Sequence, residues 1–314
     1  MRFGKVFIAL PFLAILVAHI IWGGNFVVVK LALNEFPVMT LAFLRFGLAI
    51  FLIIPFLFKL KVAQIKIKLE DIPKLAFVGF LLTTVNITLF FEGMQRTEAI
   101  DASVLHLLVP VLSLVVGWWF LKEKVYWINI FGMIAGLFGA LTIVGLPVIL
   151  NGSFASANLT GNLLILISCI TYIVGALMLK SLLKKYDPLL LNVIIFAVGA
   201  ATFLLPAYLD YVNNPTWVQN VSILGFLSLI YITLLSTITA FFLMMWGFKR
   251  VSMTQANLFQ YIEPAIAATL AVPLLGERIS YSFIVGTCLV VLGVYWGTLG
   301  KQEHHHLTQR HHKI

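Results

Sequence analysis

The sequence predicts an all-α polytopic membrane protein with ten transmembrane helices, arranged as two inverted five-helix repeats. Three observations predict this class: an excess of apolar residues, a series of apolar segments long enough to span a membrane, and an internal repeat. The 314 residues are 61% hydrophobic and 11% charged, with a mean hydropathy of +1.04. Soluble domains carry about 25% charged residues, which cover their surface. The composition therefore excludes a soluble enzyme, a disulfide scaffold and a disordered chain.

Segments of about 20 apolar residues are long enough to cross a hydrocarbon core. In chain order we expect helices at 7–30, 37–58, 73–92, 98–121, 127–149, 160–180, 188–208, 222–246, 254–274 and 281–300. Short polar breaks separate them, among them Pro37, Pro73, Asn151-Gly152-Ser153 and Asn213-Asn214-Pro215. The first segment follows Arg2 and Lys5 as a signal peptide would, but it has no Ala-x-Ala cleavage pattern. We therefore expect it to be a retained helix.

The basic residues predict the orientation. With a cytoplasmic N-terminus, 17 of the 21 Lys and Arg residues fall on the inner side. Lys30, Arg96 and Arg278 fall outside, and Arg45 lies within a span. Cytoplasmic loops of membrane proteins are enriched in Lys and Arg. We therefore expect an integral protein of the inner or plasma membrane with both termini cytoplasmic. The same rule explains the formal charge of +9 without a nucleic-acid partner.

An internal repeat divides the chain. A shift of 154 positions aligns Gly93 with Gly247, Arg96 with Arg250, Pro110 with Pro264, Glu123 with Glu277 and Gly139 with Gly293. A slightly shorter shift aligns Trp22 with Tyr172, Lys30 with Lys180 and Pro37 with Pro188. We expect five-helix repeats at 1–150 and 151–300, followed by a cytoplasmic His-rich tail at 301–314. Because five is odd, the second repeat is inverted, which is typical of secondary transporters with a substrate site near the midplane.

Three parts of the sequence form recognisable motifs. They are WGGNFVVVKLALNEFP (Trp22–Pro37) followed by LAFLRF (Leu41–Phe46), ASVLHLLVPVLSLVVGWWFLKE (Ala102–Glu123) and QANLFQYIEPAIAATLAVPLLGE (Gln255–Glu277). The first resembles the opening, and the other two the paired fourth and ninth helices, of EamA-type members of the drug/metabolite transporter (DMT) superfamily. The resemblance covers the chain except its tail. It implies two EamA repeats and, in most relatives, export of amino acids, other metabolites or drugs.

Polar and aromatic residues within the spans are candidates for a substrate cavity. Asn257, Gln260 and Tyr261 have the i, i+3, i+4 spacing of one helical face. A polar stripe inside a membrane is expected to face a cavity or another helix. The glycines of Trp22-Gly23-Gly24-Asn25 indicate either a cavity wall or a helix-packing notch. The predicted cavity residues are Trp22, Asn25, Tyr172, Trp246, Asn257, Gln260 and Tyr261.

Arg45 and Glu263 are the charged residues placed deep within spans. At 1.5 Å per residue they lie about 12 Å and about 13–14 Å from opposite faces of the membrane. A lone charge there costs at least ~2.5–3 kcal/mol, so each needs a partner or water. The functional hypothesis is that Glu263 binds a proton in one facing state and releases it in the other. The alternatives are a permanent ion pair, or Arg45 held by backbone carbonyls.

The remaining polar residues indicate structural roles. His19 and His106 are expected to be hydrogen-bonded packing or lining residues rather than a proton relay. The hydroxyls of Thr233, Ser236, Thr237 and Thr239 are expected to bond their own helix. Cys169 and Cys288 lie in apolar runs and support neither a disulfide nor a metal site. The His-rich tail is interpreted as a solvated segment with adventitious metal affinity.

The predicted function is a secondary transporter that exports small metabolites, amino acids above all, by alternating access. The alternative within the same fold is a multidrug or other metabolite transporter. A lipid or isoprenoid transferase is disfavoured because it needs clustered carboxylates, whereas Glu70-Asp71 is a lone pair. A channel would need a charged ring in its pore. The expected partners are a small-molecule substrate, protons and the bilayer. We expect no catalytic residues, no cofactor and no metal, and the sequence does not identify protein partners.

Overall fold

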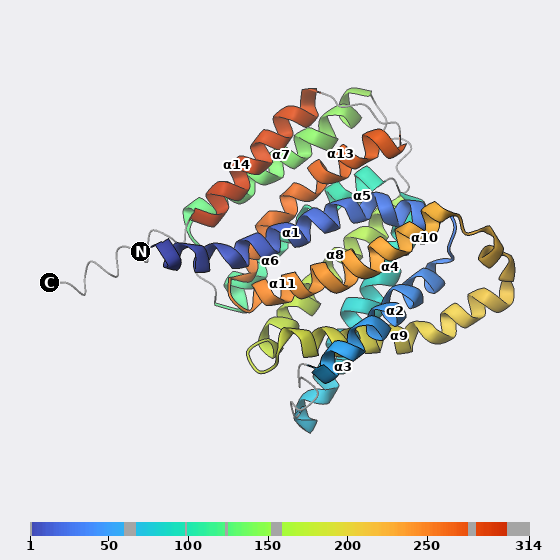
Figure 1. Cartoon of the computed structure of the whole chain (residues 1–314). Helices are drawn as coiled ribbons and strands as arrows, with labels where there is room; N and C mark the ends of the chain where they lie inside the picture. Colours follow the sequence, from blue (N-terminus) through green and yellow to red (C-terminus); the bar gives the residue numbers. More distant parts are fainter. Residues whose placement is uncertain are drawn as a thin grey trace.

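The computed structural model describes residues 2–59, 67–97, 99–122, 125–151, 159–275 and 281–299. These residues form helices and contain no strand (Figure 1). The elements of the first half are α1 (Arg2–Leu33), α2 (Val38–Lys59), η2 (Leu69–Asp71), α3 (Ile72–Gly79), η3 (Phe80–Val85), α4 (Asn86–Arg96), α5 (Ala99–Leu105), α6 (Leu108–Trp119) and α7 (Trp127–Asn151).

The second half has a similar order with one additional element, the 3₁₀ segment η7. Its elements are α8 (Leu159–Leu182), α9 (Pro188–Asn213), η5 (Pro215–Asn220), α10 (Ile223–Ile230), η6 (Tyr231–Thr239), α11 (Ala240–Phe248), α12 (Met253–Leu258), η7 (Phe259–Ile262), α13 (Glu263–Leu275) and α14 (Tyr281–Leu299). Pro188 begins α9, where the side chain of Asp187 accepts a hydrogen bond from the Leu189 amide. Ser222 caps α10 and Ser252 caps α12 through the same kind of contact.

Six helical segments in the described ranges are long and apolar enough to cross a membrane, judged by length and composition. They are Leu10–Leu33, Val38–Pro55, Leu69–Arg96, Thr160–Leu182, Pro188–Asn213 and Ile223–Phe248. Shorter apolar helices lie at Leu108–Trp119, Trp127–Gly139 and Ile284–Gly293. The prediction of an all-helical chain with membrane-spanning segments is confirmed for these ranges. The count of ten crossings and the inverted relation of the halves stay predictions.

Departures from regular α-helix occur at corresponding places in the two halves. Residues Phe80–Val85 and Tyr231–Thr239 are π-helical and lie inside the third and eighth expected spans. The fourth expected span breaks at a turn containing His106, and the ninth passes through the 3₁₀ segment Phe259–Ile262. Such interruptions are frequent at functional sites, and paired broken helices mark the binding sites of many transporters.

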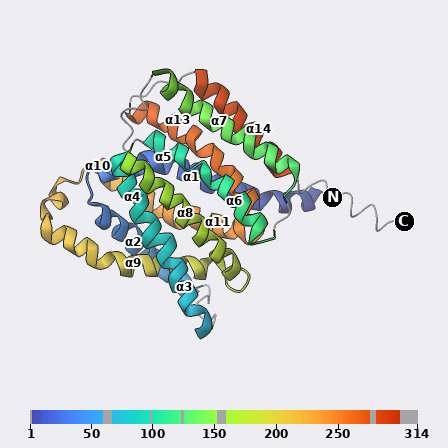
Figure 2. The ribbon, with the colours of Figure 1, turned by 180° about the vertical axis from the view of Figure 1, so that it is seen from behind.

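Helix α1 runs through the middle of the bundle, where it contacts α11, α13 and η6 (Figures 1 and 2). Gly23 makes the contact with α13 close: a Cβ at this position would lie 2.8 Å from Ile266 Cβ. At one edge of the bundle α7 packs along α14, and on another side α2 packs along α9. A central helix that touches both halves brings their side chains to one place.

Two polar clusters tie loops to helix starts. Glu35 accepts hydrogen bonds from the Ser222 amide and hydroxyl, both 2.7 Å, at the start of α10. Lys185 donates to Asp71 over 2.9 Å, and Tyr186 donates to the same carboxylate over 2.7 Å. The bond to Asp71 raises the pKa of the Lys185 ammonium. Each cluster joins two segments that the distribution of basic residues assigns to the same membrane side.

Candidate functional site

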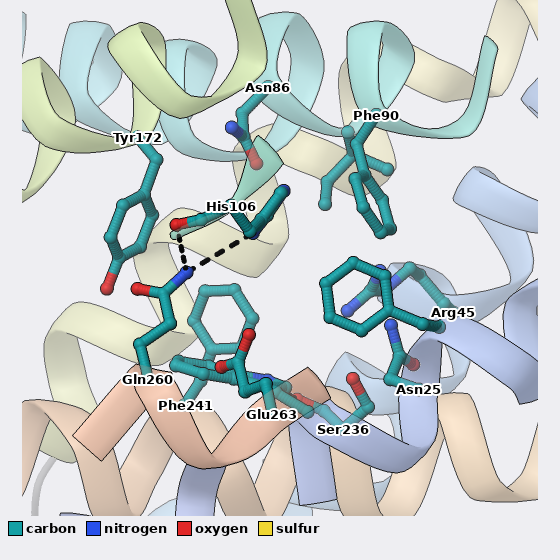
Figure 3. A pocket seen from close by; sticks show the side chains of 13 residues that line it. Asn25, Arg45, Asn86, Phe90, His106, Tyr172, Ser236, Phe241, Gln260 and Glu263 are labelled. Atoms are coloured by element: carbon teal, nitrogen blue, oxygen red, sulfur yellow. Dashed lines mark hydrogen bonds between the residues drawn. The ribbon is translucent and has the colours of Figure 1, made fainter. Parts of the chain in front are cut away.

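One cavity in the bundle is lined by polar and aromatic side chains from both halves (Figure 3). The first half contributes Trp22, Asn25, Phe26, Arg45, Asn86, Ile87, Phe90 and His106. The second half contributes Tyr172, Ser236, Phe241, Gln260 and Glu263. The volume of the cavity that is open to a water-sized group is about 90 Å³, and one water needs about 10–15 Å³ on this measure. The cavity therefore has room for several waters or a small solute.

Irregular backbone places four of these side chains. His106 stands at the turn between α5 and α6, and Gln260 lies in the 3₁₀ segment η7. Ser236 belongs to the π-helical η6, and Glu263 is the first residue of α13. Trp22 and Asn25 flank the two glycines of α1. A Cβ on Gly24 would lie 2.5 Å from the Tyr231 hydroxyl oxygen, so the glycines form a packing notch while their neighbours line the cavity.

Glu263 is buried beside His19. Glu263 Oε1 lies 2.7 Å from His19 Nδ1, and the two residues are 2% and 1% exposed. His19 Nε2 has no hydrogen-bond partner among the described residues. The imidazole also meets the Trp22 ring edge-on at 5.5 Å. The partner of the carboxylate among the described residues is therefore an imidazole.

Arg45 is 2% exposed, and its Nε donates a hydrogen bond to Thr237 Oγ1 over 2.8 Å. Thr237 donates onward to the Ile232 carbonyl over 2.7 Å. The guanidinium carbon lies 5.1 Å from the centre of the Phe46 ring and 5.6 Å from that of Phe91, within cation–π range. No ion pair joins Arg45 to Glu263 in the described part of the chain. The structure thus contradicts the alternative of a permanent pair between them.

His106 and Gln260 are in contact with each other in the wall of the cavity. Gln260 Nε2 lies 3.3 Å from His106 Nδ1 and donates to the His106 carbonyl over 3.2 Å (Figure 3). Asn86 donates to the Ser168 carbonyl over 2.7 Å, which fixes its amide against α8. In Figure 3, Arg45 and Asn25 lie at one end of the lining and Tyr172 and Gln260 at the other, with Glu263 between them.

Several buried polar atoms at the cavity have no hydrogen-bond partner among the described residues. They are Asn25 Oδ1, His106 Nε2 and Ser236 Oγ. The hydroxyls of Thr237 and Thr239 bond carbonyls of their own helix, as predicted. Those of Thr233 and Ser236 have no such partner, which contradicts the prediction for them. A buried polar atom without a partner costs about 1–3 kcal/mol, so the atoms that line the cavity are free to bind water or a solute.

Three of the predicted cavity residues lie elsewhere. Asn257 donates to the Ser113 hydroxyl, and Tyr261 is packed against Gly136, where a Cβ would lie 2.4 Å from its ring. The i, i+3, i+4 argument fails because the 3₁₀ segment turns by a different angle per residue than an α-helix. Trp246 lies near the end of α11, where Arg250 stacks 3.8 Å over its ring. Trp22, Asn25, Tyr172 and Gln260 line the cavity with Arg45 and Glu263.

Sequence reasoning did not assign Asn86, Ser236 and three phenylalanines to the cavity, and it left His19 and His106 without partners. One signal for His106 was available: Gln260, its contact, stands 154 positions along the chain. The helix ends at Glu123-Lys124 and Glu277-Arg278 and the tail at 301–314 lie outside the described residues. Among the described residues no cluster of His, Cys, Asp or Glu could hold a metal ion.

Comparisons with known proteins give the chain a family. The model of the EamA-like transporter family matches residues 9–145 and 159–298. An uncharacterized transporter of Clostridium kluyveri is 24% identical over 93% of this chain and 92% of its own length. The uncharacterized inner membrane transporter YedA of Escherichia coli K12 is 27% identical over 96% and 94%. One crystal structure shares the fold, with a TM-score of 0.72 over 93% of this chain and 98% of that chain, at 16% identity.

Proposed function

The chain belongs to the EamA-like transporter family, and from this membership we propose that it exports amino acids across the cell membrane by alternating access. The cavity between the two halves is the substrate site. The observation that carries the proposal is the charge distribution of its lining. Arg45 and Glu263 are both buried there, and each has a partner other than the opposite charge. An amino acid zwitterion supplies one group for each.

Each end of the zwitterion has a match in the lining. A guanidinium has five N–H donors, of which Thr237 takes the one on Nε of Arg45, so the others suit the substrate carboxylate. The unpartnered Asn25 Oδ1 and the carboxylate of Glu263 accept hydrogen bonds from the ammonium group. The rings of Phe26, Phe90 and Phe241 supply apolar walls for the remainder. Pockets of this composition, apolar with a few convergent polar groups, are typical of small-molecule sites.

Proton coupling centres on Glu263. Its carboxylate is shared between the His19 imidazole and the cavity, so a proton on the pair and an ammonium in the cavity compete for the same negative charge. Such competition gives antiport: a proton that binds from outside displaces the substrate ammonium, and the substrate displaces the proton inside. Intramembrane carboxylates and histidines of transporters commonly serve in this way.

The contacts of two lysines support inverted repeats at 1–150 and 151–300. Lys30 Nζ donates to the carbonyls of Met94 and Thr97, at the end of α4. Lys180 Nζ donates to those of Phe248 and Val251, at the end of α11. The 154-residue shift pairs these four acceptors, and the lysines are paired by the shorter shift. Equivalent contacts at the ends of equivalent helices are expected if the halves share one fold. The distribution of basic residues adds the proposal that both termini are cytoplasmic.

The test is transport by the purified full-length protein in proteoliposomes. Vesicles loaded with unlabelled amino acids are mixed with a labelled panel, and counterflow is measured with and without an imposed pH gradient. We expect exchange of amino acids, accumulation driven by the gradient, and loss of accumulation but not of exchange in Glu263→Gln. Arg45→Leu should lose both.

Two results would overturn parts of the proposal. Gradient-driven accumulation by a folded Glu263→Gln protein would remove Glu263 as the coupling site. Exchange of a lipophilic cation, with no amino acid of the panel exchanged, would favour the multidrug alternative. Paired measurements in inside-out and right-side-out vesicles decide the direction, since export requires uptake by the inside-out preparation.

A further inference from the structure

A second pocket lies behind the rings that line the substrate cavity. Trp22, Tyr172 and Phe241 border both spaces. The other walls of the second pocket are Leu82, Ala176, Leu179, Met244, Met245 and Phe248. The indole of Trp22 is fixed by a 3.1 Å hydrogen bond to the Ser236 carbonyl and meets the Phe241 ring edge-on at 5.5 Å. The rings therefore form an ordered partition between the two spaces.

The lining of the second pocket decides what can occupy it. None of its described lining residues is charged; five of the nine carry aliphatic or thioether side chains and the other four are aromatic. A buried water needs two to four polar partners, so an apolar space of this kind is poorly suited to water. The volume open to a water-sized group is about 20 Å³, which corresponds to one or two such groups, since one water needs about 10–15 Å³ on this measure. The space suits a short branched hydrocarbon chain and is too small for an indole.

From this arrangement we infer that the second pocket receives the side chain of the transported amino acid, and that the preferred substrates carry branched aliphatic side chains such as those of valine, leucine and isoleucine. The inference rests on the proposed function, because the zwitterion must be held at Arg45 and Glu263. With its charges there, the side chain meets the partition of Trp22, Tyr172 and Phe241. Displacement of one of these rings joins the two spaces.

Ala176 allows a direct test, because it borders the second pocket and not the polar cavity. Ala176→Leu fills the pocket and leaves Arg45 and Glu263 in place. In proteoliposomes, competition by leucine and valine against a labelled substrate should weaken at least about tenfold relative to competition by alanine and glycine, as expected for one or two excluded methyl groups. Ala201→Leu makes the same change at an exposed position of α9 and should leave the ratio unchanged.

Met245→Ala is the converse variant. It enlarges the pocket, so competition by phenylalanine should strengthen several-fold relative to leucine, a gain that a poorly folded protein would not give. Equal weakening for glycine and leucine in Ala176→Leu would identify a passage for all substrates and overturn the inference. A wild-type preference for glycine over leucine would also overturn it, while leaving amino acid transport intact. Absence of any amino acid exchange by the wild-type protein would instead overturn the proposed function.

Discussion

His106 and Gln260 stand 154 positions apart, the shift that aligns the two halves of the chain, and they touch each other. Two equivalent residues meet only near the axis that relates them. If the halves are related by the predicted pseudo-two-fold axis, this pair lies near that axis, beside the cavity. Leu107 and Tyr261, the next equivalent residues, belong to one buried apolar cluster, and Gly139 and Gly293 lie in the contact between α7 and α14. A site on such an axis can face either side with little change in its own structure.

The first prediction concerns access to the cavity. In a background in which Cys169 and Cys288 are replaced, cysteine at Asn25 or Gln260 should react with small water-soluble thiol reagents. Cysteine at Asn257 should react much more slowly, because this side chain is buried against Ser113 and lies outside the lining. The rates are measured in intact membranes with a fluorescent maleimide as the second label. Equal rates at the three positions would contradict the assignment of the lining.

Much of the fold could be predicted because it follows from composition and periodicity. Each expected span overlaps a helical segment of the described chain, and the bilayer makes long apolar runs helical whatever their detailed sequence. The cavity could be predicted only in part. Trp22, Asn25 and Gln260 stand out as polar or amphipathic side chains in apolar runs. Asn257 lies outside the lining because the backbone after it turns into a 3₁₀ helix, and this change has no clear sequence signal.

The pairing of His19 with Glu263 could not be predicted for a different reason. The two residues are 244 positions apart, and the internal repeat does not relate them. Their contact depends on how closely α1 approaches α13, which Gly23 permits. A contact between non-equivalent residues of the two halves is a property of tertiary packing, so neither residue alone indicates its partner.

The second prediction concerns orientation. Reporter fusions after Lys68 and after Asn214 should report opposite sides of the membrane, because the sequence places five spans between them. The Lys68 amide donates to the Tyr186 hydroxyl, and the Ser222 amide donates to Glu35. Each contact joins two loops that the topology assigns to the same side. Fusions with alkaline phosphatase and with a green fluorescent protein give opposite readouts at each site. The same side for both sites would rule out the predicted topology.

The third prediction tests the orientation of Arg45. Thr237→Val removes the hydroxyl that accepts from Nε and keeps the shape of the side chain. Losing a hydrogen bond to a charged group costs about 1.5–3 kcal/mol, so the KM of exchange should rise at least about tenfold while maximal exchange changes little. Thr239→Val is the matched control, because its hydroxyl bonds the Leu234 carbonyl of its own helix and has no contact with Arg45 among the described residues. A similar KM in both variants would show that Thr237 does not position the guanidinium.

The fourth prediction concerns the close contact of α7 with α14. A Cβ on Gly293 would lie 2.5 Å from the Gly136 amide nitrogen, and one on Gly139 would lie 2.6 Å from the Val290 amide nitrogen. Both obstacles are backbone atoms, so the helices must separate. Gly293→Ala and Gly139→Ala should each destabilise the protein by about 1–3 kcal/mol, as overpacking does, seen as a lower thermal midpoint in detergent. Gly47→Ala should be tolerated, because its nearest neighbour would be 3.7 Å away.

The last prediction separates the structural and functional parts of the His19–Glu263 pair. His19→Leu leaves a buried carboxylate without its partner, a change that costs about 3–5 kcal/mol when the remaining group stays charged. Adding Glu263→Gln removes that charge, so the double variant should recover most of the lost thermal stability. Transport should behave differently: gradient-driven accumulation should be absent from the double variant, because its cavity has no carboxylate to carry the proton, while exchange persists. A double variant as unstable as His19→Leu alone would show that the imidazole acts through packing against Trp22 rather than through the carboxylate. Accumulation that survives in the double variant would move proton coupling to another group.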